Sequence, residues 1–236
     1  MTAAPLPFQD RRHAGQVLAG KLAQYRGRPN LLVLALPRGG VAVGFEVACA
    51  LQAPLDVCVV RKLGFPGHEE YAMGAIASGG VCVMNPLPGL SVSPEAVAAV
   101  TAREQAELVR REQLYRSQRP AIGIAGRSVI VVDDGLATGS TMRAAVRAIR
   151  QQHPAQLVVA VPVGAEETCQ ELRDEAEADE VVCVAMPQPF RAVGLWYENF
   201  LQSSDEEVCT LLEEARQAQG QRMAAQGRAG GRPSSL

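Results

Sequence analysis

Two adjacent acids stand at the end of an apolar run in the stretch SVIVVDDGLATGSTM, residues 128–142. Carboxylates accept hydrogen bonds from vicinal hydroxyls, as the acidic residue of a dinucleotide site does for ribose. After Asp133 and Asp134 the chain turns to small residues and then enters a predicted helix. A glycine-containing loop at a helix N-terminus exposes backbone N–H groups, and the helix dipole adds positive potential there. The acids and the loop together are complementary to a sugar 5-phosphate.

The loop differs from the two common phosphate-binding patterns. A P-loop has Lys before its Ser or Thr, whereas Gly139 is followed directly by Ser140. The glycine spacing also differs from G-x-G-x-x-G. The alternative is an ordinary strand, turn and helix in which one Asp caps the helix. That alternative leaves the second adjacent acid unexplained.

A second candidate anion site lies in LALPRGGVAVG, residues 34–44, where a strand end leads into a helix. Gly39 and Gly40 allow the backbone to approach an anion closely, and Arg38 adds a fixed positive fork. The alternative is a plain glycine-rich turn with an exposed arginine.

Alternating strand and helix patterns predict the elements that position these residues. Short apolar runs without polar alternation are typical of strands covered on both faces; they occur at 31–37, 54–63, 128–134, 155–163 and 180–187. Residues 73–84 predict a further strand or a hairpin. Asp10 is expected to cap one helix and Ser93 a long one, with Pro94 at its first position. This alternation predicts an α/β fold with a mainly parallel sheet flanked by helices.

The C-terminal stretch has a different composition. Residues 216–236 are rich in Gly, Gln and Arg and have almost no large apolar residue, which predicts a disordered tail. Residues 1–215 are predicted to form the folded domain.

Composition excludes several classes of protein. The formal net charge is −2, so no global positive field would attract nucleic acid or an anionic membrane. The six cysteines form no C-x-x-C pair and mostly lie in apolar runs, which is typical of buried thiols. The sequence shows no signal peptide and no apolar run of the ~20 residues that span a bilayer. A cytoplasmic location with reduced thiols is expected.

The stretch VIVVDDGLATGST resembles the phosphoribosyl pyrophosphate (PRPP) signature of the type I phosphoribosyltransferases. The resemblance implies the fold of that family, with a small hood and a flexible loop. It also implies that Asp133 and Asp134 hold the ribose hydroxyls. The residues that it implies around the 5-phosphate are Gly135, Ala137, Thr138, Gly139, Ser140 and Thr141. Arg38, Gly39 and Gly40 would form the pyrophosphate loop, which in this family often has an unusual peptide geometry.

The resemblance also implies a mobile loop near RKLGFPGHEEYAMGAI, residues 61–76. Arg61 and Lys62 at a strand end would neutralise the departing diphosphate. Few packing anchors are expected in such a lid. Glu70 resembles an acid of uncharacterised relatives and could orient a nucleophile. The alternative for 68–70 is a solvated surface turn.

The acceptor would be recognised by a hood in AMPQPFRAVGLWYENF, residues 185–200, whose aromatic residues are candidates for stacking on a base. These candidates are Phe190, Trp196 and Tyr197, of which Trp196 is predicted as a substrate-binding residue. The alternative is that these rings pack against the helix that starts near Ser204.

The implied reaction displaces diphosphate from carbon 1 of ribose by a nitrogen acceptor, with Mg²⁺ bridging diphosphate and ribose oxygens. The implied catalytic residues are Asp133, Asp134, Arg61, Lys62 and Glu70. Asp133 could touch the metal through water, and no residue is assigned as a direct metal ligand. The implied partners are PRPP and a small acceptor, with no membrane and no nucleic acid. Helix 94–118 offers a surface for a homodimer.

Two other functions compete with transfer. The same fold could be a non-catalytic sensor of PRPP or of a nucleotide. A diphosphokinase that makes PRPP would need an ATP-binding segment, which the sequence does not show. Nothing in the hood selects one acceptor.

Overall fold

The computed structural model describes residues 6–84, 92–117, 119–175 and 178–229. The strands are β1 (Leu31–Ala35), β2 (Leu55–Val57), β3 (Val60–Phe65), β4 (His68–Ala77), β5 (Val81–Met84), β6 (Ser128–Val132), β7 (Gln156–Val163) and β8 (Glu180–Ala185). The α-helices are α1 (Arg11–Lys21), α2 (Gly39–Leu51), α3 (Pro94–Arg116), α4 (Ser140–Arg150), α5 (Glu166–Asp174) and α6 (Asp205–Ala229). Two short 3-10 helices are η1 (Ala23–Tyr25) and η2 (Val193–Trp196).

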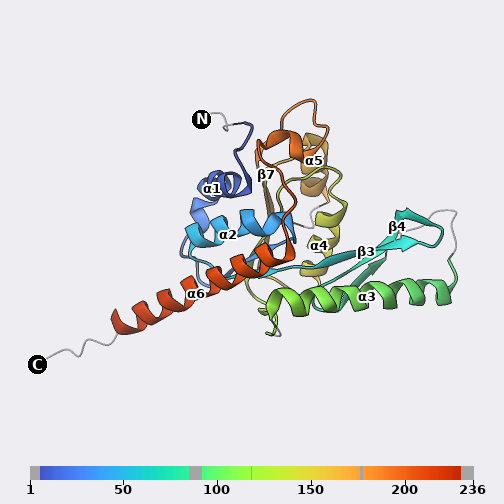
Figure 1. Ribbon diagram of the computed structural model, residues 1–236, viewed down its shortest axis with the longest axis horizontal. Coiled ribbons are helices and arrows are strands. Elements are labelled where there is room, and N and C mark those ends of the chain that lie inside the picture. Colours follow the sequence, from blue (N-terminus) through green and yellow to red (C-terminus); the bar gives the residue numbers. More distant parts are fainter. Residues whose placement is uncertain (1–5, 85–91, 118, 176–177, 230–236) are drawn as a thin grey trace, which may run out of the picture.

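Five strands form a parallel sheet in the order β2-β1-β6-β7-β8. Successive side chains of a strand point to opposite faces, so both faces carry apolar residues. Val129 and Val131 pack with α4 and α5, whereas Ile130 and Val132 pack with α1 and α2. The predicted fold, a mainly parallel sheet flanked by helices, is confirmed (Figure 1).

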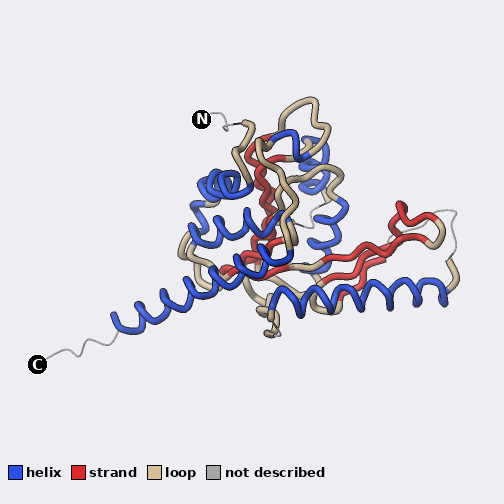
Figure 2. Tube along the Cα trace, in the orientation of Figure 1, coloured by secondary structure: helices blue, strands red, loops and turns tan. Residues whose placement is uncertain are grey.

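A second, antiparallel sheet has the order β3-β4-β5. The predicted single strand over 54–63 is wrong, because the chain leaves the parallel sheet after Val57 and enters the second sheet at Val60. An apolar run has the same pattern in either sheet, so the sequence does not mark the break. Residues 73–84 contain the end of β4, a turn and β5, and they form a hairpin, which is the second of the two predicted alternatives. Figure 2 shows the β3–β4 hairpin projecting from the body of the molecule beside α3.

Residues 61–76, expected to form a mobile loop, lie in this hairpin. Leu63 and Met73 are fully buried in the apolar cluster that joins it to α2, α3 and α6. Register irregularities occur on both sides of Gly64. The base of the hairpin is therefore anchored, and the irregular ladder begins at Gly64.

Helix α6 extends to Ala229, so residues 216–229, expected to be a disordered tail, are helical in the structure. The absence of an apolar stripe predicts a lack of packing, whereas Ala, Gln and Arg are good helix formers. Accordingly, the buried residues among the described side chains of α6 are Val208, Leu211 and Ala215 in its first half, and its later part extends away from the body (Figure 1). Residues 230–236 lie outside the described part of the chain.

Candidate active site

The carboxyl ends of β1 and β6 bring the two candidate anion loops together. These strands are neighbours in the sheet, and the backbone N–H of Leu36 donates to Val132 O at 2.9 Å. A Cβ on Gly40 would lie 2.8 Å from Val132 O and 2.9 Å from Asp133 Cα. A Cβ on Gly39 would collide with the Asp134 carboxylate. Both glycines are therefore required by the close packing of the loop at 38–40 on the two acids.

The predicted pyrophosphate loop has the unusual backbone that the family resemblance implies. The peptide bond between Pro37 and Arg38 is cis. The Arg38 side chain is one-third exposed, and its Nη1 lies 3.9 Å from Asp205 Oδ1 at the start of α6. Because this ion pair is long, the Arg38 guanidinium keeps N–H donors available for an anion bound at the loop at 38–40.

Asp133 and Asp134 are both partly buried at the end of β6. Asp133 Oδ1 accepts a hydrogen bond from the Asp134 N–H at 2.9 Å. Burial raises the pKa of the Asp133 carboxyl well above its ordinary value, and the adjacent Asp134 raises it further. Burial also raises the pKa of Asp134, while the ion pair with Arg11 opposes that rise. Such an acidic pair is suited to bind hydroxyl donors.

Arg11 is a site residue that the sequence analysis missed. Its Nε lies 2.8 Å from Asp134 Oδ2, and the two side chains are 12% and 16% exposed. The available signal was its place in the first turn of α1, where the helix dipole disfavours a positive charge. Tyr197 was predicted only as a stacking ring, but its hydroxyl donates to the backbone carbonyl of Asp134 at 2.5 Å.

The predicted 5-phosphate loop leads into α4, as expected. Gly139 precedes the helix with φ +70°, a backbone conformation that suits glycine. Two residues that the sequence analysis missed hold the loop from outside. Thr168 Oγ1 donates to Ala137 O at 2.6 Å, and Arg143 Nη1 donates to Thr138 O at 2.8 Å. Because the carbonyl groups of Ala137 and Thr138 are hydrogen-bonded on that side, the first-turn N–H groups of α4 are available to a ligand.

Two hydroxyl groups of the loop lie close to each other. Thr138 Oγ1 and Ser140 Oγ are 3.3 Å apart. Ser140 and Thr141 are partly buried in the first turn of α4, and Ala137 and Thr138 are exposed. The loop therefore combines exposed backbone with hydroxyl donors.

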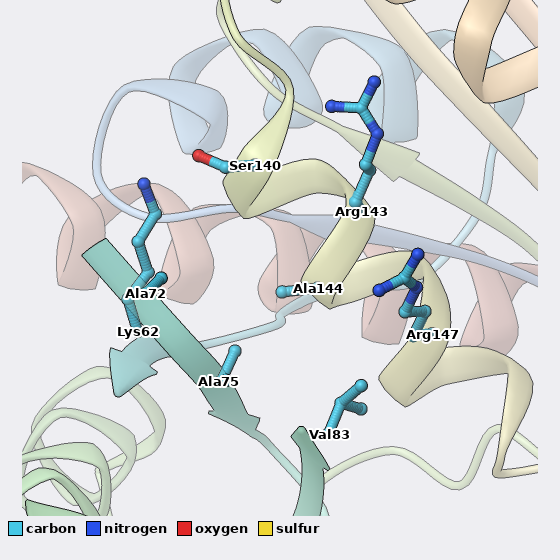
Figure 3. Close-up of a pocket in the computed structure, with 9 residues that line it drawn as sticks. Lys62, Ala72, Ala75, Val83, Ser140, Arg143, Ala144 and Arg147 are labelled. Carbon is cyan, nitrogen blue, oxygen red and sulfur yellow. The ribbon is translucent and has the colours of Figure 1, made fainter. Parts of the chain in front are cut away.

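Arg61 and Lys62 point to opposite faces of β3, as adjacent strand residues do. Arg61 donates from Nε and Nη2 to Glu104 Oε2 of α3, at 2.9 and 2.6 Å. Lys62 lines a pocket of about 140 Å³ between the hairpin and α4, together with Ser140 and Arg143. Figure 3 shows the Lys62 side chain extending toward Ser140. The structure thus brings Lys62 to the predicted 5-phosphate loop and holds Arg61 against α3.

Glu70 lies in β4, but its side chain is outside the described part of the structure. His68, at the start of β4, is exposed. The position of the acid relative to the acceptor thus stays a prediction.

The hood was predicted over residues 185–200. Since β8 ends at Ala185, we call residues 186–201, which follow it, the hood segment. It packs on the N-terminal segment through Phe8 and Tyr197, both buried, and Trp196 O accepts the Phe8 N–H at 2.8 Å. Trp196 stacks on Phe190 at a centroid distance of 6.4 Å. Among the described residues, this cluster draws its members from the N-terminal region, β7, β8 and the hood segment rather than from α6. The expected alternative of packing against the helix near Ser204 is therefore wrong for Trp196.

The hood segment also packs next to the two acids, at Gly135. A Cβ on Gly135 would collide with the Val193 side chain, so η2 packs directly on Gly135. The two acids, both anion loops and the hood consequently surround one region at the carboxyl end of the sheet.

The described residues contain neither a cluster of metal ligands nor a membrane-spanning helix. Within them, no group of three or more His, Cys, Asp or Glu side chains is arranged to hold a metal ion. None of the helices in that part of the chain combines the length and apolar character needed to cross a membrane.

Comparison with known proteins identifies the family. The model of the phosphoribosyl transferase domain matches residues 9–195. A protein of Mycobacterium tuberculosis H37Rv, named "Putative phosphoribosyl transferase", is 47% identical over 210 residues, which cover 88% of this chain and 47% of that protein. Its counterpart in strain CDC 1551 matches equally. The chain thus spans about half the length of the curated relatives it matches.

A solved structure matches most of the chain. The crystal structure of TT1426 from Thermus thermophilus matches with a TM-score of 0.77 at 43% identity, covering 88% of this chain and 98% of that chain. The domain match extends over the strands, loops and most of the hood segment described above. The chain therefore belongs to the phosphoribosyltransferase family.

Proposed function

We propose that the protein transfers the ribose 5-phosphate group of PRPP to a nitrogen acceptor and releases diphosphate. The observation that carries this proposal is the packing of Gly39 and Gly40 against Asp133 and Asp134. This packing supports a ligand arrangement with diphosphate at the loop at 38–40, ribose at the two acids and the 5-phosphate at the loop that opens α4.

Each part of the site has a separate task in this reaction. The two acids accept hydrogen bonds from the ribose diol, and the first-turn amides of α4 bind the 5-phosphate. The loop at 38–40 faces the negative charge that develops on the departing diphosphate, while Lys62 adds a positive charge beside the loop that binds the 5-phosphate. Catalysis then depends on positioning the acceptor at carbon 1 and on electrostatic stabilisation of the leaving group.

The donor set fits a hydrated Mg²⁺. One Asp133 oxygen accepts the Asp134 N–H, and the carboxylate keeps further acceptor capacity for a metal-bound water. Mg²⁺ keeps several waters and typically needs only one or two carboxylates besides substrate phosphates. When bound, it would neutralise diphosphate charge.

The proposal is tested by mixing the protein, Mg²⁺ and PRPP with a panel of purine, pyrimidine and related nitrogen acceptors. Diphosphate release is expected with at least one acceptor and is followed with a coupled pyrophosphatase assay. The control is the Asp133→Asn/Asp134→Asn variant, which should release none. PRPP binding without release from any acceptor would overturn transfer and leave a sensor of PRPP as the function of this fold.

Arg61 and Lys62 are expected to differ in effect despite being neighbours. Arg61→Gln leaves the buried Glu104 with a weaker partner, so the free energy of unfolding should fall by about 1–3 kcal/mol with PRPP affinity almost unchanged. Lys62→Gln should leave stability within about 0.5 kcal/mol and weaken PRPP binding by about 3–10-fold, through loss of one cation near the phosphates. Urea unfolding and titration calorimetry measure both quantities. Weaker PRPP binding in Arg61→Gln together with lower stability in Lys62→Gln would contradict the assignment of the two faces of β3.

A further inference from the structure

We infer that Arg11 is a positioning residue for the ribose site: its guanidinium holds the Asp134 carboxylate in the orientation that receives the ribose hydroxyls, and it ties that orientation to the hood. This inference rests on the proposed function, since it deepens the role of the same site.

Arg11 is held by two segments that lie far from it in the chain, the end of β6 and the end of the hood segment. Its Nε contacts Asp134 Oδ2 at 2.8 Å, and its Nη1 donates to Leu201 O at 2.6 Å. Its guanidinium carbon lies 3.9 Å from the centroid of the Phe200 ring. The side chain is 12% exposed. A guanidinium fixed by two hydrogen bonds and a stacking ring has little freedom, so it presents a fixed donor to Asp134.

Asp134 is confined from its other sides as well. Tyr197 donates to its backbone carbonyl, and Gly39 leaves no room beside its carboxylate. The charged and titratable groups that face Asp134 are therefore Arg11 from α1, Asp133 from the end of β6 and Tyr197 from the hood segment. Arg11 is the one cation in this group of neighbours, and it occupies one carboxylate oxygen. The second oxygen is left to accept a hydroxyl in a defined direction.

The neighbouring arginine shows that this arrangement is specific to position 11. Arg12 is 50% exposed, and its ion pairs with Glu46 and Glu214 are long, at 3.5 and 4.0 Å. Both arginines oppose the dipole of α1. Only Arg11 reaches the site, so Arg12 is a matched control from the same helical turn.

The test compares two ligands that share a phosphate and a five-membered ring. Ribose 5-phosphate carries the diol, and tetrahydrofurfuryl phosphate has no ring hydroxyls. We define the discrimination ratio as the Kd for tetrahydrofurfuryl phosphate divided by the Kd for ribose 5-phosphate. A residue that acts through Asp134 changes this ratio, whereas a general loosening of the fold weakens both ligands equally.

In Arg11→Met the discrimination ratio is expected to fall about tenfold, which corresponds to one hydrogen bond to a charged group. Arg11→Lys keeps the charge but cannot contact Asp134 and Leu201 together, so its ratio should fall about threefold. Arg12→Met should keep the wild-type ratio. Thermal unfolding checks that each variant is folded, and if Arg11→Met is not, Arg11→Lys decides by the same ratio.

The possible outcomes distinguish a failure of the proposed ribose site from a failure of the proposed role of Arg11. A wild-type protein that does not prefer ribose 5-phosphate would overturn the proposed ribose site itself. A wild-type preference that survives in both Arg11 variants would overturn only the role of Arg11. Equal weakening of both ligands in the Arg11 variants would show a direct phosphate contact or a structural role, and would also overturn it.

Discussion

The Asp133→Asn/Asp134→Asn variant is expected to bind PRPP at least ~100-fold more weakly than the wild type while keeping its fold. Asparagine has the size of aspartate and can still accept the Asp134 N–H through its amide oxygen. It replaces a charged acceptor by a neutral group that also carries an NH₂ donor. Each lost hydrogen bond to a charged group is worth about 1.5–3 kcal/mol, so two such losses account for this decrease.

The measurement is titration calorimetry with PRPP and Mg²⁺, with circular dichroism to confirm the fold. Affinity within about threefold of the wild type would remove the acids from the site and with them the proposed function. An unfolded variant would be replaced by the two single variants, of which Asp133→Asn disturbs no ion pair.

The Asp133→Asn single variant also has an expected effect on stability. Burial and Asp134 hold the pKa of Asp133 above its ordinary value, so ionising this group opposes folding. The stabilising contribution of protonated Asp133 is fully present below the pKa that this side chain has in the unfolded chain. It is lost as the pH rises through the higher pKa that the side chain has in the folded protein. At neutral pH the variant should therefore be more stable than the wild type, by about 1–2 kcal/mol. The gain should shrink as pH falls toward the ordinary range of aspartate, and urea unfolding at several pH values measures it. A loss of stability at neutral pH would contradict the assigned direction of the shift.

Gly40→Ala is expected to damage both anion loops at once. Its Cβ would meet Val132 O and Asp133 Cα, which are backbone atoms of the central strand and cannot rotate away. The turn at 38–40 must then move away from the end of β6, which separates the predicted diphosphate loop from the two acids. We expect a loss of about 1–3 kcal/mol in the free energy of unfolding and a decrease of at least ~10-fold in PRPP affinity.

Gly20→Ala is the matched control for this substitution. Gly20 lies within α1, and a Cβ there would meet no described atom within 4 Å. The change should stabilise the protein by about 0.5–1 kcal/mol, since Ala is the better helix former, and leave PRPP binding unchanged. Equal behaviour of the two alanine variants would show that the packing of the loop at 38–40 on β6 is not required for the site.

The local parts of the candidate site could be predicted because each is contiguous in the sequence. Asp133 to Thr141 follow one strand and open one helix, and Arg38 to Gly40 follow another strand. In a parallel sheet the carboxyl ends of the strands lie at one edge, so both segments lie at that edge. In the structure they pack on each other through Gly39 and Gly40.

Other expectations depended on contacts that no local pattern encodes. Arg61 and Lys62 were expected to act together, but the orientation of β3 sends one to α3 and the other to α4. The break between β2 and β3 leaves no mark in an apolar run. The helix in residues 216–229 reflects backbone propensity, whereas the prediction of disorder reflected the lack of a packing face.

The spacing of residues that are neighbours in the chain was enough to predict the alternation of strands and helices in the parallel sheet, the two candidate anion loops and the paired acids. The ion pair of Arg11 with Asp134, 123 positions away, and the packing of Tyr197 and Val193 at the same strand end emerge only in the folded chain. Such contacts depend on how helices and the hood segment pack on the sheet. Packing is settled by shape and burial over the whole domain, and it leaves no periodic signal in any one segment.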